Sequence, residues 1–179
     1  MNFSKIINFA LLPLIAVLAL SGCAGSANKK PEDADIVDIS YRAADLLMEQ
    51  AGQKIRDDSN TIVASYADIN DLTTSSPLGR IAAQQVASRF TQQGYKVTEM
   101  LLRKDVYIRE HEGEFILSRS LKNISSEYDV EQVLVGTYAV ASHNIYITAK
   151  LVRVSDSEIL SSVDYILPLG PDTTKLIRK

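Results

Sequence analysis

The sequence predicts a single α/β domain with a mixed sheet, in which a parallel core is extended by an antiparallel meander. A strand, a helix and a second strand follow one another with short links between residues 61 and 102, as in a right-handed crossover between parallel strands. The last third of the chain changes from helical to alternating periodicity, which is typical of strands. A length of 179 residues with 46% apolar content suits one globular domain.

The first element that we expect is a helix over residues 35–55. Apolar side chains recur there every three or four positions and form one stripe: Ile36, Ile39, Ala43, Leu47, Ala51 and Ile55. The next element, Thr61–Tyr66, is nearly continuous in small and apolar residues, as expected for a strand that is covered on both faces. A polar loop, Asp68–Ser76, then leads to the second helix.

The second helix, Pro77–Gln93, has clear signals at both ends. Ser75 or Ser76 can cap its first turn, and a proline at the first helical position loses no useful donor. Gly94, just past its end, suits the left-handed conformation that stops a helix. One side of the helix is apolar and is formed by Leu78, Ala82, Ala83, Val86, Ala87 and Phe90.

A strand over Lys96–Leu102 completes the crossover, and the charged segment Arg103–Gly113 is expected to be a solvent-facing excursion. A third helix is predicted for Ser118–Tyr128. Three runs rich in β-branched and aromatic residues, with turn-forming residues between them, follow as the meander: Val133–Val140, Ile145–Arg153 and Glu158–Leu167. The expected order of elements is α-β-α-β-α-β-β-β. Gly136, inside the first of these runs, indicates a close backbone approach or a bulge.

The N-terminus predicts a lipoprotein. Ile6–Leu20 is too short to cross a bilayer, which takes about 20 residues, but it fits the apolar core of a signal peptide. The residues that follow, Leu20-Ser21-Gly22-Cys23, resemble the lipobox of bacterial lipoproteins, in which small residues flank the cleaved bond and a thiol accepts the lipid. Cys23 is therefore the predicted lipid attachment site, and the alternative is a plain signal peptide with an incidental cysteine.

The predicted organisation is a signal peptide over residues 1–22, a lipidated flexible tether over 23–34, the α/β domain over 35–167 and a loosely held tail over 168–179. Ala24 is not the aspartate that commonly retains sorted lipoproteins in the inner membrane. The favoured location is therefore the periplasmic face of the outer membrane, where a tether of about 12 residues reaches roughly 20 Å.

The sequence contains no constellation that indicates catalysis. His111 and His143 are the only histidines, both fall in expected turns, and neither has a metal-ligand spacing with another histidine or cysteine. No Gly-x-Ser-x-Gly turn is present, although a catalytic triad can also be assembled in space from distant residues. A formal net charge of −3 argues against a nucleic-acid partner. We expect no enzyme activity, no metal and no cofactor.

Arg80 and Arg119 each fall in the first turn of an expected helix, where the backbone dipole disfavours a cation by about 0.3–1 kcal/mol. One interpretation is a structural ion pair with a carboxylate such as Glu99 or Glu114. The other is that Arg80, together with the polar loop, forms a contact surface at the carboxyl end of the first strand, where ligands of such sheets usually bind.

Five segments in order, behind the lipobox, together resemble the FlgO family of flagellar outer-membrane lipoproteins: Ala43–Asp45, Ser76–Arg80, Gln92–Val97, Gly113–Arg119 and Leu134–Tyr138. The resemblance extends over residues 41–167, and it implies a protein that supports flagellar assembly or stability and hence motility. The layout is also similar to the amino-terminal domain of TolB and to CsgG-like periplasmic domains, which is an analogy of fold and says little about function.

The resemblance implies contacts with other flagellar outer-membrane or basal-body proteins, in addition to the membrane contact through the lipid. Assembly of identical copies into a ring is a further alternative. The alternative function is that of a lipoprotein regulator that binds a periplasmic envelope enzyme, such as a peptidoglycan synthase.

Overall fold

The computed structural model describes residues 33–56, 59–100 and 130–178. The expected signal peptide, Cys23, the segment 103–113, the helix over 118–128 and Arg119 lie outside these ranges. The elements are α2 (Ile36–Ala51), the 3-10 turn η1 (Gly52–Lys54), β1 (Asn60–Ala64), β2 (Ala67–Asp68), α3 (Pro77–Gln92), β3 (Lys96–Met100), β4 (Gln132–Val140), β5 (Asn144–Arg153), β6 (Ile159–Pro168) and α5 (Pro171–Ile177).

Six strands in the described ranges form one mixed sheet. Its order is β3-β1-β4-β5-β6, with the short β2 also paired to β4. β1 pairs in parallel with β3 and with β4, whereas β4, β5 and β6 pair in antiparallel fashion. This arrangement confirms the predicted fold class, a parallel core extended by an antiparallel meander.

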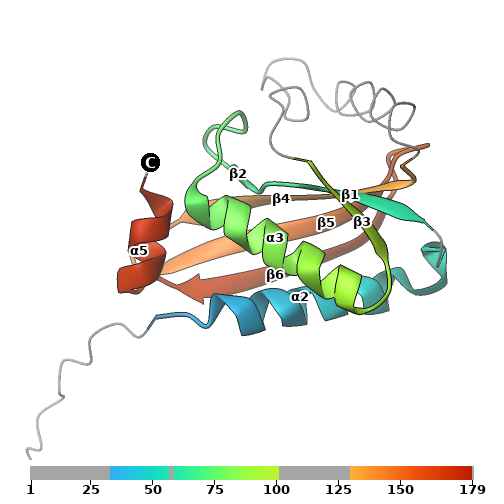
Figure 1. Cartoon of the computed structure of the whole chain (residues 1–179). Coiled ribbons are helices and arrows are strands. Elements are labelled where there is room, and N and C mark those ends of the chain that lie inside the picture. The colour runs from blue at the N-terminus through green and yellow to red at the C-terminus, as the bar shows by residue number, and fades with distance from the viewer. Residues whose placement is uncertain (1–32, 57–58, 101–129, 179) are drawn as a thin grey trace, which may run out of the picture. The chain divides into compact units, whose positions relative to one another are not determined.

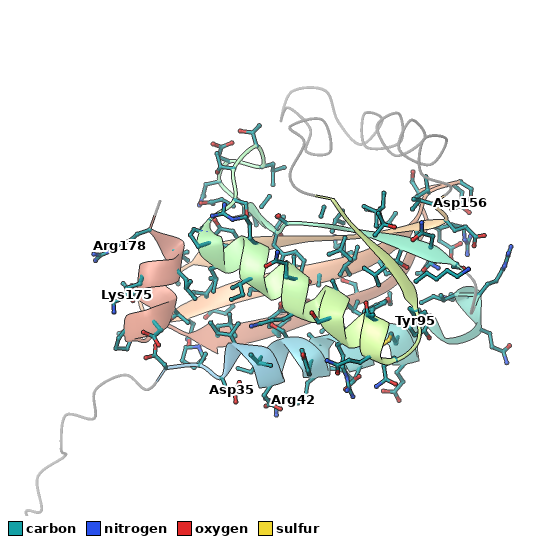
Figure 2. The ribbon with its side chains drawn as sticks, in the orientation of Figure 1. Asp35, Arg42, Tyr95, Asp156, Lys175 and Arg178 are labelled. Carbon is teal, nitrogen blue, oxygen red and sulfur yellow. The ribbon has the colours of Figure 1, made fainter. Side chains whose placement is uncertain are left out.

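Local chemistry predicts where both long helices begin and where α3 ends. Ser76 caps α3 by accepting the amide of Gly79 at 3.2 Å, and Pro77 occupies the first turn. After α3, Gly94 adopts a positive φ of 92°, as the sequence predicts. Asp35, at the start of α2 (Figure 2), caps it by accepting the amide of Asp38. The helix ends at Ala51, before the expected end at Ile55, because Gly52 adopts a positive φ of 47° there.

Both long helices pack on the same face of the sheet; in Figure 1, α3 crosses in front of the strands and α2 runs along the β6 side. Their apolar stripes pack against the strands and form the larger core cluster, which includes Leu47, Phe90 and Leu134. A smaller buried cluster lies on the other face at the β1–β4–β5 end, and it consists of Ile62, Val130, Val133, Val152 and Val154. The structure therefore buries side chains on both faces of β1, as its continuous apolar sequence predicts.

Gly136 is explained by a close approach. The aromatic ring of Tyr66 lies directly on it, so that a Cβ atom at this position would stand 2.5–2.8 Å from three ring carbons. Tyr66 is fully buried, and its amide donates to the carbonyl of Gly79 at 3.0 Å. The strand glycine thus makes room for the residue that joins β1 to α3, and the bulge alternative does not apply.

The structure differs from the sequence prediction at the C-terminus. We expected a loosely held tail, but residues 171–177 form α5, which contacts α3 (Figure 1). Thr173 is buried, and Leu176 and Ile177 pack against the larger core cluster. Asp33, at the end of the expected tether, accepts the amide of Asp172 at 2.7 Å and so attaches the start of the domain to α5.

Candidate interaction surface

The polar segment after β1 is a folded loop. β2 (Ala67–Asp68), which the sequence did not predict, lies at its start, and the Asp68 amide donates to the carbonyl of Thr74 at 3.0 Å. Asp68 and Asp71 each accept the amide of the residue two positions on, Asn70 and Thr73, in the manner of Asx turns. The loop is tied to β4 at its far end, where the Ser76 amide donates to the hydroxyl of Tyr138 at 3.1 Å.

Arg80 lies beside this loop, at the carboxyl end of β1. Its guanidinium is exposed and donates to the carbonyl of Ser75 at 3.4 Å. Among the described residues no carboxylate forms an ion pair with it, and the side chain of Glu99 is not among those described. Arg80 is thus placed where the contact interpretation requires it, while Arg119 and Glu114 lie outside the described ranges.

An apolar row crosses the face of the sheet that α2 and α3 leave uncovered. Ala139 pairs with Tyr146, and Tyr146 pairs with Ile166, so these side chains lie next to one another across β4, β5 and β6. Ile69, directly after β2, donates its amide to the carbonyl of Tyr138 and lies at the other end of the row. Tyr146, Ile166 and Ile69 are 49%, 50% and 53% exposed, which is unusual for large apolar side chains placed side by side.

A polar cluster that the sequence analysis missed joins the two long helices. Arg89 on α3 makes two hydrogen bonds to the carboxylate of Asp45 on α2, at 2.8 and 3.0 Å. The guanidinium also lies over the ring of Tyr41, whose hydroxyl accepts from Gln92. Hydrogen bonding to Asp45 raises the pKa of Arg89. Asp45 and Gln92 both lie in segments that carry the family resemblance, but the sequence does not indicate that they belong to one cluster.

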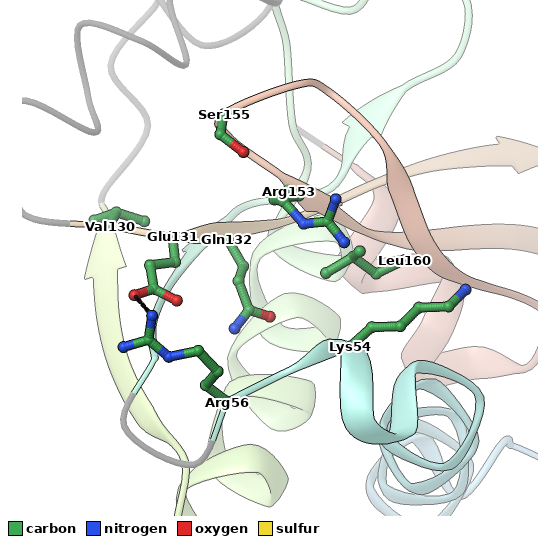
Figure 3. A pocket seen from close by; sticks show the side chains of 8 residues that line it. All are labelled: Lys54, Arg56, Val130, Glu131, Gln132, Arg153, Ser155 and Leu160. Carbon is green, nitrogen blue, oxygen red and sulfur yellow. Dashed lines mark ion pairs between the residues drawn. The ribbon is translucent and has the colours of Figure 1, made fainter.

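A cavity of about 420 Å³ opens at the end of the sheet near η1 (Figure 3). Lys54, Arg56 and Arg153 line it, which at first suggests an anion site. However, Arg56 forms an ion pair with Glu131 at 3.4 Å, and Arg153 is held by two acidic side chains of the β5–β6 turn. These carboxylates compensate most of the positive charge, so the cavity offers no concentrated charge to an anion.

The part of the chain that the structure describes contains no group of His, Cys, Asp and Glu residues that could hold a metal ion. His143 is exposed in the turn between β4 and β5, and His111 lies outside the described ranges. Within the same ranges, no helix is both long enough and apolar enough to cross a membrane.

The comparison with protein families identifies the chain. The FlgO protein family model matches residues 41–172, which is most of the sequence and nearly all of the domain described above. The chain belongs to the FlgO family. The match begins within α2 and ends at residue 172, just after the start of α5, so it extends past residue 167, the expected end of the domain.

Solved structures show the same fold. The LpoB C-terminal domain from Salmonella enterica is similar with a TM-score of 0.53 at 11% identity, over 74% of this chain and 97% of that chain. The LpoB C-terminal domain from Escherichia coli gives a TM-score of 0.51 at 11% identity, over 76% of this chain and 98% of that chain. No curated protein sequence matched this chain. At such low identity the likeness establishes the fold and leaves function to be argued separately.

Proposed function

We propose that this chain is a lipid-anchored protein at the periplasmic face of the outer membrane, and that it supports flagellar assembly or stability, and hence motility, by protein–protein contact. The observation that carries the proposal is the FlgO family match over residues 41–172, preceded by the lipobox-like sequence that ends at Cys23.

The mechanism in this proposal is positioning. Acyl chains on Cys23 hold the protein at the membrane, and more than one chain is needed for stable anchoring. A short tether then limits how far the domain can travel. The apolar row on the open face of the sheet and the loop beside Arg80 are the surfaces on which a partner would dock.

A second function fits the same anchored interaction domain. It is regulation of a periplasmic envelope enzyme such as a peptidoglycan synthase, and its support is the fold shared with the LpoB C-terminal domains. This support is a likeness of fold alone, so we rank the regulatory function below the flagellar role, which the family membership supports.

Deletion of the gene separates the two functions. We expect the deletion strain to swim poorly and to carry fewer stable flagella, with near-normal growth. The wild-type gene should restore swimming, whereas the Cys23→Ser gene should not. The Cys23→Ser protein should also fail to incorporate labelled palmitate and should be lost from the envelope fraction. Normal swimming in the deletion strain would refute the flagellar role, and a cell-wall defect with normal swimming would support the regulator instead.

A further inference from the structure

The outer edge of β6, along which α2 runs, carries no further strand among the described residues. Within the described residues the sheet ends at β6, whose inner side pairs with β5. Ser162 donates its amide away from β5, to the side chain of Gln50. Because backbone groups alternate along an antiparallel strand, the amides and carbonyls of Asp164 and Ile166 point to the same outer side as those of Ser162.

The Gln50 side chain makes a hydrogen bond that a neighbouring strand would otherwise make. Its side-chain oxygen accepts the Ser162 amide at 3.3 Å, as the carbonyl of an added strand would. No hydrogen bond to the outward amides of Asp164 and Ile166 is present in the described part of the chain. The bond to Gln50 is long and comes from an exposed side chain, so a strand that offers a backbone carbonyl can displace it.

The side chains around this edge define what an added strand would meet. Ile166 is exposed beside Tyr146 on the open face of the sheet, and Asp164 is exposed two residues before it. The Asp164 carboxylate accepts one hydrogen bond, from the hydroxyl of Thr148 at 2.6 Å, and keeps further acceptor capacity. On the helix side, Leu46 is 46% exposed and lies one turn before Gln50, on the same side of α2.

We propose that the outer edge of β6 binds an extended segment of a partner protein as an additional strand, with a basic side chain beside Asp164 and an apolar side chain beside Ile166. Backbone hydrogen bonds would supply the affinity, and the alternating side chains would supply the specificity. The apolar row from Ala139 to Ile166 would then continue onto the partner. This inference rests on the proposed function in so far as that function is exercised through protein contact.

Charge argues against a second copy of this chain as the occupant. If two β6 edges paired about a twofold axis at position 164 or 165, Asp164 would stand opposite or diagonal to the Asp164 of the other copy. Like charges at such cross-strand positions are destabilising, whereas an opposite charge is favourable. A partner strand that carries lysine or arginine is therefore the better match for this edge.

The test uses the full-length lipoprotein in detergent and three fluorescein-labelled synthetic peptides that alternate valine and threonine. The first has a central lysine, the second a central glutamate, and the third is the lysine peptide N-methylated at its central amides. Fluorescence anisotropy should show the lysine peptide binding about fivefold more tightly than the glutamate peptide, by the size of cross-strand charge effects. N-methylation should abolish binding, because it removes the backbone donors while leaving the charge unchanged.

Charge reversal on the protein provides the decisive comparison. Asp164→Lys should invert the preference between the two peptides, and Asp164→Asn should remove it. Glu49→Lys, an exposed position on α2 with the same change of charge, should leave the preference unchanged. Three results would each overturn the inference. They are an equal effect of Glu49→Lys, binding of the N-methylated peptide, and concentration-dependent dimerisation that Ile166→Pro abolishes. If the wild-type protein does not bind the lysine peptide in this way but its gene restores swimming in the deletion strain, the binding role of the β6 edge is refuted and the proposed function is not.

Discussion

Tyr66 and Gly136 illustrate at the residue scale how one side chain fixes the junction between the parallel core and the first helix after it. The ring of Tyr66 fills the space that a side chain at position 136 would need, and the tyrosine amide holds the first turn of α3 through Gly79. A fully buried residue therefore determines where α3 starts relative to the sheet.

Gly136→Ala should destabilise the domain. An alanine normally favours a strand over glycine by about 0.5–1 kcal/mol, but here the new methyl group overlaps the Tyr66 ring, and such overpacking costs about 1–3 kcal/mol. Urea denaturation should therefore show a lower free energy of unfolding. In a Tyr66→Leu background the same glycine change should cost much less, and an equal cost in both backgrounds would show that the ring is not the cause.

Burial raises the pKa of the Tyr165 hydroxyl above its ordinary value, and the nearby hydroxyls of Ser40 and Tyr66 partly offset this increase. In the unfolded chain the same group ionises near its ordinary value of about 10. Since the folded state keeps the proton for longer, the contribution of Tyr165 to stability is complete below about pH 10 and declines as the pH rises beyond it. Thermal unfolding from pH 8 to 11 should therefore show a shallower alkaline decline for Tyr165→Phe than for the wild type. Parallel curves for the two proteins would contradict the assignment.

At the scale of elements, α2 and α3 each carry their own capping signals, but their mutual contact depends on side chains far apart in the sequence. Asp45 and Arg89 are 44 positions apart in the sequence and form a bidentate ion pair at the interface between the helices, called the seam below. The stacking of Arg89 on Tyr41 adds a second contact across the same seam. We infer that this cluster fixes the register of the two helices, because both partners are planar groups that match in only one geometry.

A double-mutant cycle tests this role. Asp45→Asn and Arg89→Gln should each lower the melting temperature by a few degrees, and the double variant should lose less than the sum, because either single change already breaks the pair. The coupling should weaken as salt is raised, since the pair is partly exposed. The exposed pair Asp38–Arg42 within α2 serves as a matched control and should show little coupling. Strict additivity at the seam would mean that the ion pair does not join the helices.

For the molecule as a whole, α2 and α3 cover one face of the sheet, and among the described residues an exposed apolar row lies on the other face. The exposed row on that face and the outer edge of β6 meet at Ile166, so one partner can contact both. The start of the domain at Asp33 is attached to α5. In the proposed function this attachment fixes the point from which the tether leaves the domain.

Local signals along the chain are sufficient to predict most of the elements and their order. The caps of α3, the positive φ at Gly94, the parallel crossover and the three meander strands all follow from residues that are neighbours in the chain. The family resemblance, carried by five short segments, was likewise readable before the structure and is confirmed by the family match.

Which surfaces pack against one another is visible only in the folded chain. Periodicity shows that one side of an element is buried, but it does not name the partner, because burial is satisfied equally by any apolar surface of suitable shape. For this reason the packing of α5, the pairing of Asp45 with Arg89 and the open edge of β6 could not be predicted. Each depends on contacts between segments whose separation along the chain leaves no local trace.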